Sequence, residues 1–127
     1  MYRSPLLNGP LSAALADLAH GDEIVLTGAA LPRPDVLPSI DLSLVAGNPT
    51  VVEVLDALLP TFPVEYGLAA HEVLHDCPSI AADLSDRLPH LDTIPHADLM
   101  TRSHRAKVVV RTGDDERYAN VILRRGF

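Results

Sequence analysis

The sequence predicts an α/β protein, with a β-sheet, helices packed on it and a β-hairpin at the end of the chain. Segments with apolar residues at helical spacing alternate with short β-rich runs, which is the pattern of α/β folds. Hydrophobic residues make up 47% of the chain, enough for a core, and 127 residues are the length of one domain. We therefore expect a single domain over residues 1–127.

The first half of the chain is expected to contain two helices and two strands. Leu11, Leu15 and Leu18 lie at positions i, i+4 and i+7, which is one face of a helix over residues 10–19. Thr50 is a typical N-cap for a second helix. The other segments expected here are strands at residues 23–27 and 40–45, a proline-containing loop at 28–38 between them, and a turn at 47–49.

The second half of the chain predicts two more helices and a closing pair of strands. Residues 113–115, Gly-Asp-Asp, are typical of a turn between two β-rich runs, so these runs are expected to pair as a hairpin. Ile80 and Leu84 are expected to point inward from a helix. The expected elements are a strand at 64–70, helices at 79–88 and 96–103, an extended piece at 93–95, and the hairpin strands at 107–112 and 119–124.

Charge and composition exclude several classes of function. Lys and Arg number 10 against 17 Asp and Glu, so the net charge is −7 and binding to nucleic acid is disfavoured. The single cysteine, Cys77, excludes an internal disulfide framework and fits a reducing compartment. The sequence begins without the apolar stretch of a secretory signal and contains no run near the ~18 apolar residues of a membrane span. We expect a cytoplasmic protein with no membrane or nucleic-acid partner.

Residues 71–75 spell His-Glu-Val-Leu-His, the H-E-x-x-H pattern of zinc metalloproteases. On a helix the two histidines would converge on one zinc ion, but Pro78 follows within three residues. In a strand, residues four apart lie ~13 Å from one another and cannot share an ion. No third ligand is obvious, so the pattern favours two exposed histidines and we expect no metal.

His20 lies between the end of the first expected helix and the first expected strand. The ends of strands are where α/β folds place ligands, which favours a functional histidine. A cationic histidine is also stabilised at the C-terminus of a helix, with no function required. These local features leave both interpretations open.

Tyr118 and Asn120 are two residues apart, so in a strand they would share one face. A phenol and an amide each donate and accept hydrogen bonds, which suits the hydroxyl groups of a sugar. The alternative is an exposed strand face without a ligand.

Taken together, these segments resemble the ribose pyranase and fucose mutarotase family over nearly the whole chain. The resemblance is carried by His-Gly-Asp at residues 20–22, Gly-Asn-Pro-Thr at 47–50, Arg-Thr-Gly at 111–113 and Tyr-Ala-Asn at 118–120. It implies an isomerase that interconverts the ring forms or anomers of a free monosaccharide without a metal or an organic cofactor. It also implies a compact α/β sandwich with a mixed sheet flanked by helices. The family forms ring-shaped homo-oligomers, commonly decamers, so the resemblance further implies active sites at subunit boundaries.

The resemblance makes His20 the catalytic acid and base, and it places His96, Tyr118 and Asn120 in the sugar pocket. Opening a cyclic hemiacetal requires one proton delivered to the ring oxygen and another removed from the anomeric hydroxyl. Histidine suits both transfers because imidazole groups titrate near neutral pH.

The sequence departs from the family at Gly28, which occupies the site position where the family typically has an aspartate. Because glycine supplies neither charge nor a side-chain hydrogen bond, Asp22 or Asp41 would have to provide the carboxylate. Three functions follow. The first is a mutarotase of free monosaccharides. The second is the same scaffold acting on a bulkier hemiacetal or ketal, and the third is a sugar-binding protein without catalysis.

Overall fold

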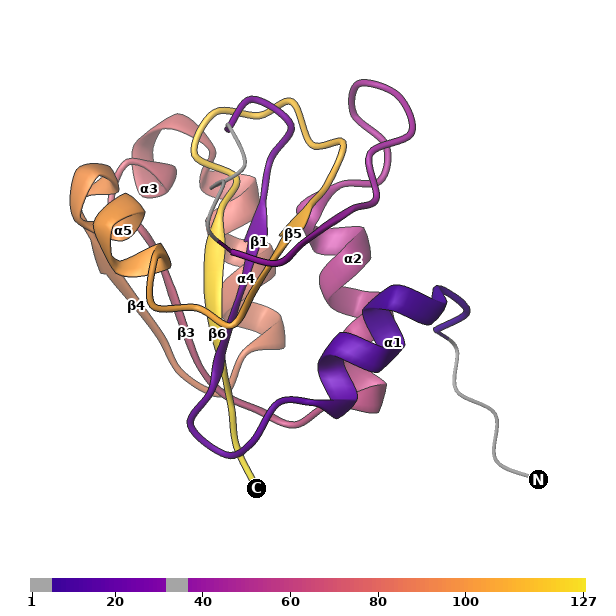
Figure 1. Ribbon diagram of the computed structural model, residues 1–127. Coiled ribbons are helices and arrows are strands. Elements are labelled where there is room, and N and C mark those ends of the chain that lie inside the picture. The colour runs from indigo at the N-terminus through magenta and orange to yellow at the C-terminus, as the bar shows by residue number, and fades with distance from the viewer. Residues whose placement is uncertain (1–5, 32–36) are drawn as a thin grey trace.

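A six-stranded sheet forms the middle layer of the computed structural model, which describes residues 6–31 and 37–127 (Figure 1). Residues 32–36 of the expected proline-containing loop lie outside the described residues. The strands are β1 (Glu23–Thr27), β2 (Ser39–Asp41), β3 (Val64–Ala70), β4 (Leu91–Ile94), β5 (Val108–Arg111) and β6 (Val121–Arg125). The helices are α1 (Gly9–Ala16), α2 (Val51–Leu58), α3 (Val73–Asp76), α4 (Pro78–Arg87) and α5 (His96–Ser103), with a 3₁₀ turn, η1, at Leu59–Thr61.

The two faces of the sheet are covered by different helices. Helices α1, α2 and α4 pack on one face, where their leucines and valines meet Ile24 and Leu26 of β1. Helix α5 packs on the other face, where Leu99 meets Val25. Alternate side chains of β1 therefore belong to two separate hydrophobic cores, as expected for a strand buried on both faces. The predicted mixed sheet flanked by helices is confirmed.

The strand order is β2-β5-β1-β6-β3-β4. Strand β6 is antiparallel to both of its neighbours, β1 and β3, whereas the pairs β1–β5, β2–β5 and β3–β4 are parallel. Five strands thus run in one direction and end at the same edge of the sheet. We call this the carboxyl edge, and it is the edge where open α/β sheets place their ligands.

The predicted terminal hairpin is wrong. Strands β5 and β6 pair with opposite sides of β1, so β1 lies between them. The connection over residues 112–120 is long enough to cross the end of β1, and its Asp114 carbonyl accepts a hydrogen bond from Ala29 N–H at 2.8 Å. The Gly-Asp-Asp signal marks a change of direction, but turn residues do not determine which strand the chain joins next.

Strand β2 is shorter than expected, ending at Asp41 rather than Val45. The Asp41 carboxylate accepts hydrogen bonds from the backbone N–H and the hydroxyl of Ser43, which turns the chain out of the sheet. This contact, together with the charge of Arg111, holds the pKa of Asp41 below its ordinary value. Asp41 is therefore committed to the end of β2.

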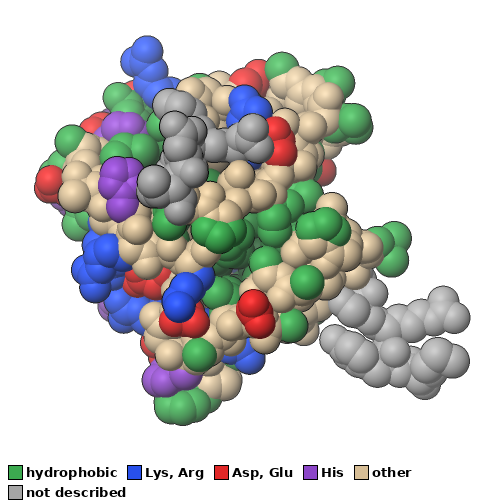
Figure 2. Space-filling model, in the orientation of Figure 1, with side chains coloured by type: hydrophobic (Ala, Val, Ile, Leu, Met, Phe, Trp, Pro, Cys, Tyr) green, Lys and Arg blue, Asp and Glu red, His purple; other side chains and the backbone are tan. Residues whose placement is uncertain are grey.

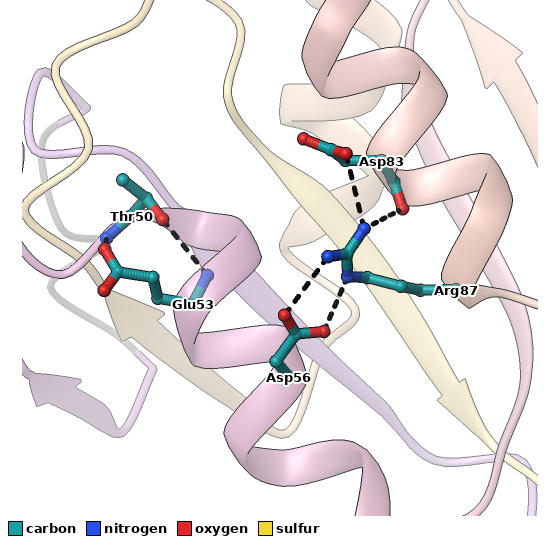
Figure 3. A network of polar contacts seen from close by, with 5 residues as sticks. All are labelled: Thr50, Glu53, Asp56, Asp83 and Arg87. Atoms are coloured by element: carbon teal, nitrogen blue, oxygen red, sulfur yellow. Dashed lines mark hydrogen bonds and ion pairs between the residues drawn. The ribbon is translucent and has the colours of Figure 1, made fainter.

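Helix α2 begins with a capping box, as the predicted N-cap indicates (Figure 3). The Thr50 side chain accepts from Glu53 N–H, and the Glu53 side chain accepts from Thr50 N–H. Arg87 of α4 contacts Asp56 of α2 and Asp83 of its own helix, so it joins the two helices on their exposed side.

Within the described residues, no helix is long and apolar enough to cross a membrane.

Asp114 links the β5–β6 connection to α2, although its side chain is only 3% exposed. One carboxylate oxygen accepts from Val51 N–H at the first turn of α2, at 2.9 Å, and the other accepts from Glu116 N–H at 3.0 Å. A carboxylate at a helix N-terminus is favourably placed in the helix dipole. The side chain therefore fixes both the helix start and the loop.

We predict that Asp114→Ala lowers the free energy of unfolding by about 2–3 kcal/mol, because the N–H groups of Val51 and Glu116 lose a charged acceptor. Urea unfolding followed by circular dichroism measures this. The matched control is Asp115→Ala, whose exposed side chain has no hydrogen-bond partner among the described residues. Equal stability of the two variants would contradict the role given to Asp114.

Candidate functional site

A pocket of about 100 Å³ opens at the carboxyl edge, where β1 and β4 end and β6 begins. We call it the edge pocket. Four of the six site residues predicted from the sequence line it: Gly28, His96, Tyr118 and Asn120. The remaining lining residues are Ala30, Leu31, Glu116 and Arg117.

His96 is the first residue of α5, directly after β4. Its backbone N–H donates to both oxygens of the Glu72 carboxylate, at 3.0 and 3.2 Å. Its ring meets the Tyr118 ring edge-on, with 5.0 Å between centroids. The Nδ1 atom is buried and has no hydrogen-bond partner within the described part of the chain. A buried imidazole nitrogen without a partner is costly, so this atom is suited to a polar ligand.

Asn120 is held by the end of β1. Its Oδ1 accepts from Gly28 N–H at 3.0 Å, and its residue is 4% exposed. Because the oxygen is used, the amide presents its NH₂ group as a donor to anything else in the pocket. The orientation of this amide therefore follows from a backbone contact across the sheet.

Tyr118 and Asn120 do not share a strand face, because both precede β6. Tyr118 has a φ of +66°, which is uncommon for a residue other than glycine, and its carbonyl accepts from Asn120 N–H at 2.8 Å. This tight turn directs both residues to the edge pocket. Both residues therefore line one pocket, although not by sharing a strand face as predicted.

Gly28 is crowded by the loop that crosses β1. A Cβ atom at this position would lie 2.9 Å from the Asp114 carbonyl oxygen and 3.5 Å from that of Ala119. A side chain at position 28 would therefore displace the backbone of the loop. The glycine leaves no extra space there, because the loop carbonyls already lie close to where a Cβ atom would be.

His20 and Asp22 lie at the opposite edge of the sheet, ahead of β1. The His20 ring stacks on Phe127 with 3.8 Å between centroids, and its Nε2 is 3.4 Å from the Glu65 carboxylate. The Asp22 carboxylate accepts from Ala19 N–H and closes the turn before β1. The strand itself spans about 16 Å, so within one chain neither residue reaches the edge pocket.

Asp22 also borders a cleft of about 290 Å³ that is rich in basic side chains. Figure 2 shows Lys and Arg side chains gathered beside α5 with acidic groups among them. In this cleft the buried Glu23 carboxylate pairs with Arg102 and Arg124. Burial by itself raises the pKa of Glu23, but these two arginines outweigh burial and hold that pKa below its ordinary value.

Two side chains of the H-E-x-x-H motif have partners elsewhere in the structure. His71 Nδ1 is 2.6 Å from Thr93 Oγ1, and Glu72 is occupied by His96 N–H. No group of three or more metal-ligating side chains occurs among the residues that the structure describes. The motif's glutamate instead anchors α5, a role with no local signal because the two partners are 24 residues apart.

Glu116 and Arg117 also line the edge pocket, although their positions in the sequence do not predict it. The Cys77 thiol donates to a Glu116 carboxylate oxygen at 3.2 Å. Burial, followed by the effect of Glu116, raises the pKa of Cys77 to about 11. Both pocket residues belong to a polar stretch just before Tyr118, which resembles an ordinary surface turn.

Two solved structures of sugar complexes share this fold. The structure of Bacillus subtilis RbsD complexed with D-ribose matches with a TM-score of 0.91 and 35% identity, covering 100% of this chain and 98% of that one. The fucose mutarotase in complex with L-fucose from Streptococcus pneumoniae matches with a TM-score of 0.79 and 26% identity, covering 95% and 94%.

Sequence comparison agrees with the structures. D-ribose pyranase 2 of Streptomyces griseus subsp. griseus is 43% identical over 126 residues, covering 99% of this chain and 98% of that protein. The model of the RbsD / FucU transport protein family matches residues 1–127. The chain belongs to this family, and the resemblance stated from its motifs is confirmed.

We predict that Glu72→Ala destabilises the protein by about 1–2 kcal/mol, since the N-terminus of α5 loses its charged acceptor. Nuclear magnetic resonance should also show a shift of the His96 imidazole signals. His75→Ala, which alters an exposed histidine of the same motif, should change neither. Loss of bound zinc in the His75 variant would contradict this interpretation of the motif.

Proposed function

We propose that this chain is a cofactor-independent sugar mutarotase of the pyranase type, acting as a single domain over residues 1–127. The observation that carries the proposal is the edge pocket, where His96, Tyr118 and Asn120 meet. The 43% identity with a D-ribose pyranase supports it over almost the full length. The isomerase interconverts ring forms or anomers of a free monosaccharide.

The polar groups of the edge pocket suit an uncharged polyol. The phenol of Tyr118 and the imidazole of His96 can each donate or accept, and the Asn120 amide donates. Two relatives that are 43% and 41% identical to this chain are named D-ribose pyranases, so a free pentose is the substrate to test first. The chain's net charge of −7 does not hinder the approach of a neutral sugar.

The reaction needs only proton transfer. A base takes the proton of the anomeric hydroxyl, the bond between the anomeric carbon and the ring oxygen breaks, and an acid protonates that oxygen. The open-chain aldehyde then closes again through the same hydroxyl, giving the other anomer, or through a different one, giving the other ring size. Positioned acid–base groups accelerate such steps by typically ~10²–10⁴-fold.

His20 is the proposed acid and base, and it would serve the edge pocket of a neighbouring copy. Its ring is exposed at the far edge of the sheet, about one strand length from its own chain's pocket. A heterologous contact that repeats around a closed ring brings one copy's His20 edge to the next copy's pocket. We therefore propose a ring-shaped homo-oligomer, with a decamer as the specific expectation, acting in the cytoplasm.

The other two functions have less support. A bulkier hemiacetal would need space at Gly28, and the Asp114 carbonyl fills that space. A sugar-binding protein without catalysis would keep its affinity when His20 is removed, so it is separated from the mutarotase by measuring exchange and binding together.

We predict that the wild-type protein accelerates anomer or ring exchange of at least one free sugar in saturation-transfer nuclear magnetic resonance on D-ribose, L-fucose and related sugars. His96→Ala should lower the rate by at least tenfold, because the pocket loses a donor or acceptor. His75→Ala is the control. Sugar binding with no acceleration across the panel would favour the non-catalytic alternative instead.

We also predict that two inactive variants restore each other. His20→Ala and His96→Ala, each inactive alone, are mixed, unfolded and refolded together. If every site combines His20 of one copy with His96 of the next, about a quarter of the sites in random mixed rings are intact. Recovery of about that fraction of the wild-type rate supports the shared site. No recovery from mixed oligomers would contradict the shared site.

A further inference from the structure

We propose that Glu116 is a specificity-determining residue of the edge pocket, whose carboxylate accepts hydrogen bonds from hydroxyl groups of the bound sugar. The inference rests on the proposed function and identifies a contact that the predicted site residues do not provide. Three observations support it. Few side chains of the pocket accept hydrogen bonds, Glu116 is held at two points, and the loop crowds Gly28.

Apart from the neutral groups of His96 and Tyr118, the edge pocket has few side-chain acceptors. The Asn120 oxygen is used by Gly28 N–H, and the Arg117 guanidinium is a donor only. Ala30 and Leu31 present apolar side chains. Among the described residues that line the pocket, Glu116 carries the one carboxylate. The hydroxyl groups of a bound sugar need hydrogen-bond acceptors. Hydrogen bonds to carboxylates are about twice as strong as hydrogen bonds between neutral groups.

Glu116 is held in position at both ends. Its backbone N–H donates to Asp114 Oδ1 at 3.0 Å, which anchors it to the loop that crosses β1. Its Oε2 accepts from the Cys77 thiol at 3.2 Å. The other carboxylate oxygen has no hydrogen-bond partner among the described residues, so it can accept from a ligand, and Glu116 belongs to the pocket lining. The thiol therefore acts as a positioning group for the carboxylate.

The crowding at Gly28 explains why the carboxylate comes from the loop. A Cβ atom there would lie 2.9 Å from the Asp114 carbonyl oxygen and 3.8 Å from that of Glu116. An acidic side chain at position 28 would therefore clash with the present path of the loop. Gly28→Asp should consequently displace the loop and fail to replace a missing carboxylate at Glu116.

The test compares Glu116→Gln with the wild-type protein, because glutamine keeps the shape and removes the charge. Exchange rates are measured over a range of D-ribose concentrations, and then with 2-deoxy- and 3-deoxy-D-ribose. We expect KM for D-ribose to rise at least tenfold with a smaller change in kcat. We also expect the wild-type preference for ribose over one deoxy sugar to disappear in the variant. A purely structural role would not move that preference.

Asp115→Asn is the matched control, since it removes a neighbouring exposed charge that does not line the pocket. Alkylation of Cys77 in the folded variants gives a second measurement that needs no sugar. Glu116→Gln should speed it because the pKa of the thiol falls when the carboxylate is removed. An unchanged KM and an unchanged sugar preference in Glu116→Gln overturn this inference alone. A wild-type protein that neither binds nor interconverts any sugar overturns the proposed function as well.

Discussion

The buried carboxylate of Asp114 is the contact on which the site depends. Strands β5 and β6 lie on opposite sides of β1, so the chain between them has to pass over the end of that strand. Asp114 fixes this crossing by binding the first turn of α2 with its side chain and Ala29 N–H with its carbonyl. One wall of the edge pocket is therefore held by a helix N-terminus that never touches the pocket.

The second support of the pocket is the segment over residues 71–77, which connects β3 to α4. Glu72 holds the backbone of His96 on one side, and Cys77 holds the Glu116 carboxylate on the other. This one segment thus supports two walls of the pocket that are distant in sequence. Within a stretch that has the pattern of a zinc site, Glu72 and Cys77 therefore have structural partners in the two walls of the pocket.

The sequence allowed most elements to be predicted, because their apolar residues follow a helical or strand period. The predictions for β1, β3 and α5 match the structure to the residue. The relation of β5 to β6 could not be predicted, since turn residues specify a bend and not a partner strand. Glu72 and Glu116 were also out of reach because their partners, His96 and Cys77, are 24 and 39 residues away. The hydrogen-bonding groups of Tyr118 and Asn120 predicted them as site residues, although the left-handed backbone of Tyr118 brings them together.

The position of β6 sets the order in which the molecule can be completed. This strand follows every other described element along the chain, yet it lies in the middle of the sheet between β1 and β3. During synthesis, the β2-β5-β1 part and the β3-β4 part have no shared strand until β6 leaves the ribosome. Contacts between residues far apart in sequence are slow to form, and here they join two half-sheets at once. Because Tyr118 and Asn120 directly precede β6, the edge pocket cannot be complete before this part of the chain has been made.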